Sequence, residues 1–489
     1  MSLARDTVRG AFWTVTAGIA SRALGLIGTL VVTRFVTPAD YGEVMVAAVL
    51  VMSANQFSTL GLGQFLIAKP DAGRAAAFHA TTFHVLLGAI ALVALLLLGP
   101  RLGPAFEAPR LTAFLPGLAL SAFLDRVAFV PERILVRDVR FGTLGAVRTA
   151  GDVAFSSVSV LLAAAGWGAT ALVIGNVARS LVRMVWFVAV VERRDWFEPC
   201  PFSLQKTREL LAFGLPMSAG ALCAFASRRW DNLLVSRFFG AGTTGMYNLA
   251  YNLADVPAIQ VGEQIGDVLL PSFARMDVAR RPSALVRSIT LLAIIVFPLA
   301  IGLGSVAPTL IAALFDAHWR PVGPMLVVLS ALSVTRPIGW TIASYLQARR
   351  MPRTILGLEL FKLLVILLAL VTLGRIGPLW ACTAVGVAFA AHALASLYVV
   401  RRVDGIPLQR MLANLGPVLA ACALMVGAVL GARWFLTEWH GVPIPVHLVI
   451  EILVGVLSYP MALWLFARDD SRELVARLTD ALGRPRAAA

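Results

Sequence analysis

Apolar runs of about 20 residues recur along the chain, and short polar segments separate them. A helix needs about 20 mostly apolar residues to cross the hydrocarbon core of a bilayer. Strands of a membrane barrel would instead alternate apolar and polar positions in segments of about ten residues, and this chain shows no such alternation. The pattern therefore predicts an all-α polytopic membrane protein with about fourteen transmembrane helices, near residues 9–33, 41–67, 78–99, 111–132, 144–165, 169–191, 208–238, 244–272, 285–306, 321–347, 353–374, 377–400, 413–433 and 446–467.

Arginine and lysine gather in alternate connections between these spans. The segments on the side of the N-terminus hold 28 of them, whereas those on the other side hold 7. Because cytoplasmic loops carry an excess of basic residues, both termini are predicted to be cytoplasmic. The longest connections, near 192–207 and 273–284, are too short for a soluble domain.

Composition narrows the function classes. Hydrophobic residues make up 59% of the chain and charged residues only 14%, well below the roughly 25% of soluble domains. The net charge of +15 follows the membrane topology, so it gives no support to a nucleic-acid partner. The four cysteines form no CxxC pair, and no phosphate-binding loop motif is present. We therefore expect no metal and no cofactor.

The chain repeats itself at a constant offset of 203 residues. The segment Leu30–Phe35, followed after six residues by Gly42, matches Leu233–Phe238, followed after six residues by Gly245. Six spans separate the copies, so the two halves are expected to have parallel orientation about an axis along the membrane normal. The alternative is chance similarity between two apolar hairpins. We predict two six-helix lobes, residues 1–203 and 204–405, and an appended helix pair with a basic tail, residues 406–489.

Three stretches resemble the Wzx-type polysaccharide flippases of the multidrug/oligosaccharidyl-lipid/polysaccharide (MOP) exporter superfamily. Arg34–Gly42 is similar to the family's R-x-L-x-P-x-x-Y-G hairpin, with Val36 in place of leucine. The other two are Asp231–Gly240 with Gly245–Ala250 and Val256-Pro257, and Pro271–Phe273. Tyr345–Arg350 departs from the family pattern because it lacks a glycine. The resemblance implies flipping of undecaprenyl-pyrophosphate-linked oligosaccharides across the bacterial cytoplasmic (inner) membrane, for O-antigen, capsule or exopolysaccharide assembly, with polysaccharide polymerase machinery as a partner.

Charges inside the predicted spans point to a site. Arg228, Arg229 and Asp231 lie in one apolar run, where a charge at mid-bilayer costs about 2.5–3.5 kcal/mol on insertion scales. Such residues face a packed interior or a wet cavity. The chain is expected to reverse near residue 241, which places Asp231 level with residues 251–255. Because arginines donate paired hydrogen bonds to phosphate oxygens, we predict one chamber between the lobes, positive on balance.

The predicted substrate-binding residues are cations for the pyrophosphate or acidic sugars, and aromatic or amide residues for the glycan. They are Arg22, Arg126, Arg228, Arg229, Arg336 and Lys362, with Tyr247, Asn248, Tyr251 and Asn252. In the alternative interpretation these charges only neutralise one another, as in the spacings Arg228–Asp231 and Glu359–Lys362. Intramembrane carboxylates also mark proton and cation relays, so candidates for H+ or Na+ coupling are Asp231, Asp255, Glu263 and Asp267. Coupling to no ion is the alternative.

Two other function classes compete with the flippase. Another exporter of the same superfamily, either a lipid II flippase or a multidrug cation antiporter, would share the layout, although a multidrug site is expected to be more aromatic and acidic. A membrane polymerase or glycosyltransferase would need a sizeable loop for its catalytic groups. The chain has no such loop, so we expect no enzyme and no catalytic residue.

Overall fold

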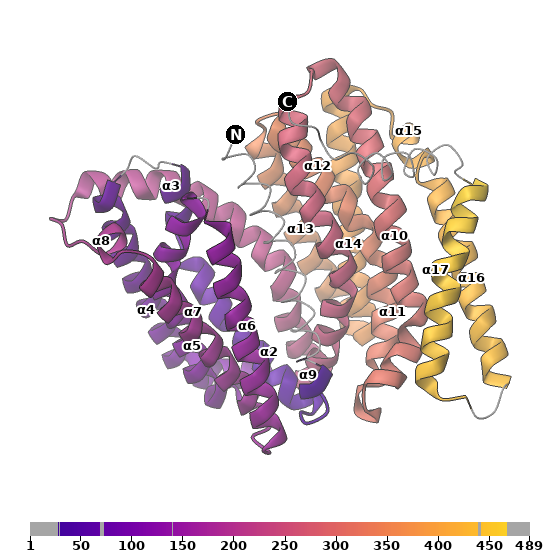
Figure 1. The fold of residues 1–489 in the computed structure, drawn as a ribbon, viewed down its shortest axis with the longest axis horizontal. Helices are drawn as coiled ribbons and strands as arrows, with labels where there is room; N and C mark the ends of the chain where they lie inside the picture. The colour runs from indigo at the N-terminus through magenta and orange to yellow at the C-terminus, as the bar shows by residue number, and fades with distance from the viewer. Residues whose placement is uncertain (1–27, 29, 69–72, 139, 439–441, 467–489) are drawn as a thin grey trace. The chain divides into compact units, whose positions relative to one another are not determined.

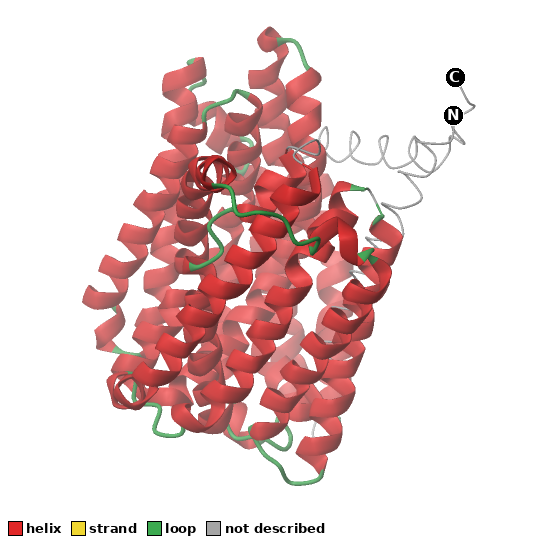
Figure 2. Cartoon of the chain, turned by 90° about the vertical axis from the view of Figure 1, so that its left-hand side faces the viewer, coloured by secondary structure: helices red, strands yellow, loops and turns green. Residues whose placement is uncertain are grey.

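The computed structural model describes residues 28, 30–68, 73–138, 140–438 and 442–466, without the side chains of residues 64, 67, 68, 216, 217, 256–268, 271, 408 and 410. All regular structure in this part of the chain is helical (Figure 2). Ten of the described helices are long and apolar enough to cross a membrane, or eleven if Leu204–Leu215 and Ser218–Asp255 form one bent span. The prediction of an all-α polytopic protein is confirmed. The predicted span 9–33 lies largely outside the described residues, so the count of fourteen stays a prediction.

The chain folds into two compact units, one ending at Asn248 and the other beginning at Leu249. The predicted lobe boundaries at residues 203 and 405 stay a prediction. Unit 1 contains α2 (Pro38–Phe57), α3 (Leu62–Ala68), α4 (Gly73–Ala105), α5 (Leu111–Arg137), α6 (Phe141–Ala164), α7 (Thr170–Val190), the single turn α8 (Arg193–Trp196) and the first part of α9 (Leu204–Arg275) (Figure 1).

Unit 2 continues from α9 into the second half of the chain. Its helices are α10 (Arg281–Leu314), α11 (Val322–Leu332), α12 (Arg336–Ala348), α13 (Pro352–Thr372), α14 (Pro378–Asp404), α15 (Leu408–Ala413), α16 (Gly416–Glu438) and α17 (Ile444–Phe466). One 3-10 turn, Ser333–Thr335, joins α11 to α12 within the predicted span 321–347. The helices α16 and α17 pack side by side and against α10 (Figure 1).

The predicted span 41–67 is broken in the structure. The helix α2 begins with Pro38 in its first turn and with the Thr37 hydroxyl capping the backbone N–H of Asp40 at 3.2 Å, a favourable start. It ends at Phe57, and four residues separate it from the start of α3 at Leu62. Leu60 and Gly61 lie between them in the left-handed region, with φ of 47° and 63°. Irregular backbone at membrane depth requires protein groups to bond the freed carbonyls.

The helix α9 contains the chain reversal that was predicted near residue 241. Its only non-helical residue is Gly240, with φ 76° and ψ 173°, a conformation that essentially only glycine adopts. The residues on both sides remain helical. The reversal is therefore tight, and Asp231 lies level with Tyr247, one helical turn nearer to Gly240 than the predicted residues 251–255.

The two copies of the repeated hairpin meet within unit 1 at their glycines. A Cβ on Gly42 would overlap the carbonyl of Ala241, and a Cβ on Gly245 would overlap the carbonyl of Pro38. Ala241 follows Pro38 by the same 203 residues that separate Gly245 from Gly42. Such reciprocity is typical of a contact across a two-fold axis, in which each copy presents the same patch to the other. The internal repeat itself stays a prediction.

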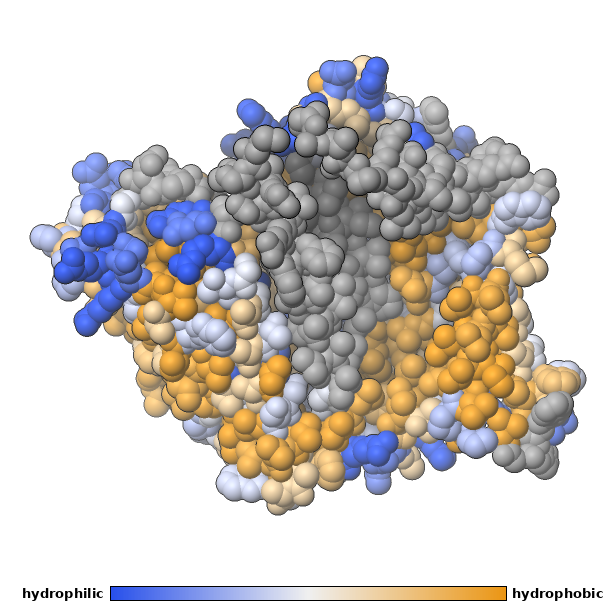
Figure 3. All heavy atoms as spheres, in the orientation of Figure 1, coloured by the Kyte–Doolittle hydropathy of each residue, from blue (hydrophilic) through white to orange (hydrophobic). Residues whose placement is uncertain are grey.

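Each unit has a buried apolar core and an apolar outer surface. Leu62, Phe65 and Leu135 belong to the core of unit 1, and Phe297, Ile342 and Leu397 to that of unit 2. Large side chains such as Leu97 and Leu368 are exposed on the outside. Apolar residues cover much of the flank of each unit in the face drawn in Figure 3. This surface suits contact with lipid chains, because polar groups there would lose hydration.

Candidate functional site

Asp231 lies in a buried cluster that joins the two limbs of α9 around Gly240. The Tyr247 hydroxyl donates to Asp231 Oδ2 at 2.5 Å, and the backbone and side-chain nitrogens of Asn232 both donate to Oδ1 at 2.9 Å. Asn248 Nδ2 donates to Asn232 Oδ1 at 2.9 Å. All four side chains are 1% exposed. The structure brings together the predicted site residues Asp231, Tyr247 and Asn248, and Asn232, which was not predicted, joins them across the reversal.

The two arginines before Asp231 differ in exposure. Arg228 is exposed, whereas Arg229 is half-buried. Beside them, Trp230 Nε1 donates to Ser53 Oγ at 3.2 Å, which holds this limb of α9 against α2. Adjacent helical residues point about 100° apart, so the packing of half-buried Trp230 against α2 leaves Arg228 turned outward.

Arg336 lies in a buried polar cluster of unit 2. It is 7% exposed and forms an ion pair with Asp255. Its guanidinium also contacts two aromatic rings, with Cζ 4.9 Å from the centre of the Tyr251 ring and 4.5 Å from that of Phe389. Cations over aromatic faces gain roughly 0.5–2 kcal/mol, more where water is excluded. Three predicted residues therefore meet here, and the aromatic Phe389 on α14 joins them.

The same cluster continues through Phe389 to Lys362. The ammonium of Lys362 lies 5.9 Å from the centre of the Phe389 ring and 2.6 Å from Glu359 Oε2. This confirms that Glu359 and Lys362 pair on one face of α13. His392 on α14, which sequence reasoning missed, places Nε2 3.9 Å from Glu359 Oε1. The sequence could have indicated His392, because it is a histidine within an apolar run.

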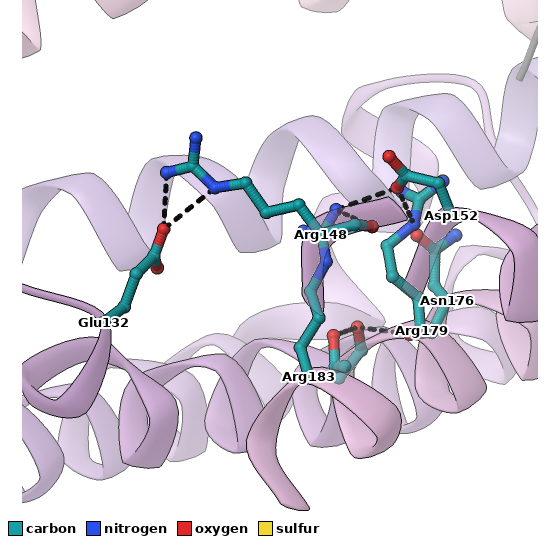
Figure 4. A network of polar contacts seen from close by, with 8 residues as sticks. Glu132, Arg148, Asp152, Asn176, Arg179 and Arg183 are labelled. Atoms are coloured by element: carbon teal, nitrogen blue, oxygen red, sulfur yellow. Dashed lines mark hydrogen bonds and ion pairs between the residues drawn. The ribbon is translucent and has the colours of Figure 1, made fainter. Parts of the chain in front are cut away.

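A second cationic region lies within unit 1, on α5, α6 and α7 (Figure 4). Asp152 on α6 accepts ion pairs from Arg179 Nε at 3.2 Å and from Arg183 Nη2 at 2.8 Å. Arg148 on α6 pairs with Glu132 on α5 at 2.5 Å. Figure 4 shows these residues, and both partners of Asp152, Arg179 and Arg183, come from α7. The pairs join helices whose charged residues are many positions apart in sequence.

Arg126 lies fully within unit 1, at 1% exposure. Its Nη1 donates to the His84 carbonyl and its Nη2 donates to the Asn55 carbonyl, both at 2.7 Å, and Nη2 also donates to Ser58 Oγ. One of these acceptors, the Asn55 carbonyl, lies in the last turn of α2, so Arg126 bonds one of the carbonyls at the helix end before the break. Arg126 has no ion pair among the described residues.

Three predicted residues cannot be placed. Arg22 lies outside the described residues, as do the side chains of Glu263 and Asp267. Asn252 is half-buried on α9. Within the described part of the chain, no three His, Cys, Asp or Glu side chains cluster closely enough to hold a metal ion. The single chamber shared by both lobes stays a prediction.

Sequence reasoning also missed a buried ion pair in the appended helices. Glu451 on α17 is 0% exposed and accepts from Arg433 on α16 at 2.9 and 2.8 Å. The Thr309 hydroxyl on α10 donates to the same carboxylate at 2.7 Å, and Arg433 donates to the Ser305 carbonyl. The signal was a lone carboxylate in the apolar run 446–467. The group fastens α16 and α17 to α10.

The stretch Tyr345–Arg350, which lacks the glycine of the family pattern, also has a structural role. Arg349, just beyond the span Val322–Ala348, forms an ion pair with Asp404, whose other oxygen accepts from the Tyr345 hydroxyl at 2.8 Å. Burial lowers the pKa of Arg349, but its bonds with Asp404 and Tyr345 outweigh burial, and the pKa is raised overall. The charged pair ties the end of α12 to the end of α14.

Comparisons with known proteins agree with these features. The profile of a family described as "Polysaccharide biosynthesis protein" matches residues 31–324. "Lipopolysaccharide biosynthesis protein WzxC" of Escherichia coli (strain K12) is 26% identical over 377 residues, covering 77% of this chain and 76% of that protein. "Succinoglycan biosynthesis transport protein ExoT" of Rhizobium meliloti (strain 1021) is 24% identical over 502 residues, covering 99% and 98%.

Solved structures establish the fold. "Lipid II flippase MurJ, inward closed conformation" matches with a TM-score of 0.77 at 16% identity, covering 93% of this chain and 99% of that one. An inward-facing "multidrug resistance MATE family transporter of the MOP superfamily" matches with a TM-score of 0.54 at 17% identity, covering 85% and 96%. These structures are of transporters and a flippase. The chain therefore belongs to the polysaccharide biosynthesis protein family, as a Wzx-like multi-pass membrane transport protein with the fold of the MOP superfamily.

Proposed function

We propose that the protein flips undecaprenyl-pyrophosphate-linked oligosaccharides across the bacterial cytoplasmic membrane by alternating access. Such a substrate is amphiphilic, with an apolar chain, a charged pyrophosphate and a polar glycan. The observation that carries the proposal is that unit 2 holds both kinds of site that this substrate needs. It has a buried cluster with two cations and, separately, an apolar cavity.

The cationic cluster suits the pyrophosphate. Arg336 and Lys362 are 7% and 6% exposed, and each is neutralised by one carboxylate, Asp255 or Glu359. Each mid-membrane charge carries an insertion cost of about 2.5–3.5 kcal/mol. Apolar side chains would avoid this cost if the residues served only to pack the helices together. The planar guanidinium of Arg336 donates paired hydrogen bonds to phosphate oxygens, and Lys362 adds a second charge.

The apolar cavity suits an isoprenoid chain. Its volume is about 500 Å³, and its walls come from α10, α16 and α17, including Leu303, Val429 and Val456. Ligand cavities in proteins span about 300–1,000 Å³. The buried pair of Glu451 and Arg433 fixes α16 and α17 against α10 beside it.

Ion coupling follows from the same pairs. In our proposal Asp255 and Glu359 compete with the pyrophosphate for Arg336 and Lys362, so protonation of either carboxylate favours substrate binding. Asp231, Glu263 and Asp267 remain further candidates for H+ or Na+. Transport measured in vesicles with an imposed proton or sodium gradient tests the idea, and insensitivity to both gradients contradicts coupling.

Substitution of the two cations tests the function itself. We expect Arg336→Gln and Lys362→Gln each to lower surface glycan at least tenfold at normal protein level. Lipid-linked oligosaccharide should accumulate on the cytoplasmic face, as it should in a strain that lacks the gene. The matched control is Arg237→Gln, because Arg237 is exposed and pairs with exposed Glu107, and surface pairs contribute about 0–1 kcal/mol.

Each alternative has its own outcome. Unchanged surface glycan in both variants would show that this cluster does not bind the substrate. Unchanged glycan in the deletion strain, with defective lipid II flipping or increased sensitivity to cationic drugs, would instead assign the chain to another exporter of the same superfamily.

A further inference from the structure

A partly open cavity of about 210 Å³ lies inside unit 1, among α2, α4, α5, α6 and α7. A water molecule takes about 30 Å³ of liquid volume, so the cavity has room for about seven waters or for one sugar ring. Its lining includes both cations and carboxylates, together with the amide of Asn55. No residue of the Asp231 cluster lines it, so it is a distinct place in the unit.

The cavity contains a buried cation that no carboxylate neutralises within the described residues. Arg126 donates to two backbone carbonyls and one hydroxyl, all of them neutral. The C-terminal end of α2 supplies one of these carbonyls, and a helix end carries a partial charge equivalent to about half an electron. Gly88 on α4 lets the guanidinium lie there, because a Cβ at Gly88 would overlap it. Part of the positive charge therefore remains available to a ligand.

The other charged residues in the cavity leave it positive by one. Arg148 is paired with Glu132, and Arg183 is paired with Asp152, which does not line the cavity. Asp125 adds the second carboxylate of the lining. With histidine counted as neutral, the three arginines and two carboxylates of the lining give one net positive charge. Asp152 and its second partner Arg179, outside the lining, add one charge of each sign and leave that total unchanged.

Unsatisfied polar atoms show what else the cavity would accept. Asn55 Oδ1, His84 Nδ1 and Arg126 Nε are buried and make no hydrogen bond within the described protein. Asn55 Oδ1 is an acceptor and Arg126 Nε is a donor, so a ligand that satisfies both must donate as well as accept. Buried polar groups are normally hydrogen-bonded, to protein, ligand or ordered water.

We propose that this cavity binds one singly charged, hydroxylated sugar residue of the uronic-acid class, with its carboxylate on Arg126 and its hydroxyls on Asn55 and Glu132. The inference rests on the proposed function, because it names a sugar that the transported glycan would present. One negative charge matches the single net positive charge. Sugar hydroxyls donate to the carboxylates and to Asn55 Oδ1. Pyrophosphate fits poorly, since it carries more negative charge, lacks such donors and is repelled by Asp125 and Glu132.

Binding to the purified full-length protein tests the inference. Sodium glucuronate, glucose, sodium pyrophosphate and sodium chloride would be titrated by calorimetry in lipid nanodiscs. We expect glucuronate to bind at least tenfold more tightly than glucose or pyrophosphate, with no heat from chloride alone. The preference for glucuronate over glucose should disappear in Arg126→Gln, whereas Arg237→Gln should keep it.

A second variant guards against misfolding, because Arg126→Gln also removes bonds to the end of α2. Asn55→Asp keeps the backbone carbonyl that accepts from Arg126 and puts a carboxylate in the cavity beside Arg126. We expect it to weaken glucuronate binding at least tenfold while glucose binding and the melting temperature stay unchanged. Equal affinity for glucuronate and glucose, tighter binding of pyrophosphate, no binding by any probe, or unchanged affinities in both variants would overturn the inference.

The proposed function has separate readouts. If glucuronate binds as expected but the deletion strain flips lipid-linked oligosaccharide normally, the cavity stands and the flippase proposal fails. If the deletion strain accumulates lipid-linked oligosaccharide while glucuronate shows no preference, the flippase stands and the sugar site fails.

Discussion

Removal of Arg433 should detach the appended helix pair from α10. Glu451 is 0% exposed, and its carboxylate accepts two bonds from Arg433 and one from Thr309. Arg433→Met removes the counter-charge and two of the three donors, and breaking a buried pair in this way costs about 3–5 kcal/mol. Most of that loss comes from the carboxylate left behind, not from the strength of the pair.

The double variant separates these two effects. In Arg433→Met/Glu451→Met both charges are gone and the volume is filled by apolar side chains, a replacement that is often neutral or stabilising. We therefore expect the double variant to lie within about 1 kcal/mol of the wild type. Adding Glu451→Met to Arg433→Met should then recover at least about 2 kcal/mol, so the two substitutions are not additive.

Steric trapping gives the free energy directly, with labels placed on α10 and α17 so that the trap reports separation of these helices. The matched control is Arg375→Met, an exposed arginine in the connection between α13 and α14. A double variant as unstable as Arg433→Met would refute the argument that the buried charge causes the loss. A loss below about 1 kcal/mol in Arg433→Met would show that Glu451 finds another partner.

Two further predictions concern α9 and the repeated hairpins. Tyr247→Phe removes the hydroxyl that donates to buried Asp231, so we expect the free energy of unfolding, measured by steric trapping across the reversal, to fall by about 1.5–3 kcal/mol. The control Tyr398→Phe, in an exposed ring, should be neutral, and an unaffected Tyr247→Phe would show that Asp231 does not depend on this bond. Gly42→Ala and Gly245→Ala each place a methyl group against a facing backbone carbonyl, so each should destabilise the protein by about 1–3 kcal/mol. Gly427→Ala, where a Cβ meets nothing within 4 Å, should be neutral or stabilising, and equal stability of all three variants would contradict the close approach.

The pattern of apolar runs could predict most of the fold because each span satisfies its own backbone bonds. The reversal near Gly240 and the pair of Glu359 with Lys362 were also readable, since each depends on spacing along one local segment. The break after Phe57 was not readable, because Leu60 has no preference for the left-handed conformation that it adopts. Packing of the chain, not local propensity, imposes it.

The candidate site was predictable only in part, for a related reason. Mid-span charge identified Arg126, Asp231 and Arg336 as costly residues, but partners on other helices depend on how each helix is rotated in the bundle. The pairs of Arg336 with Asp255 and of Arg433 with Glu451 are therefore visible only in the structure. The assumption of straight helices also placed Asp231 level with residues 251–255, one helical turn farther from Gly240 than Tyr247, which it contacts.

The reciprocal contact of Gly42 and Gly245 has a consequence for the origin of the chain. If the two predicted lobes arose by duplication of one gene, the ancestor paired as a homodimer, and the patch around its single glycine faced its own copy. Any side chain added there would have met the partner's backbone twice. After fusion, the two codons became free to change separately. Each glycine lies against the carbonyl of the other hairpin, so a fused gene of this origin would keep at both positions a constraint that the ancestor encoded once.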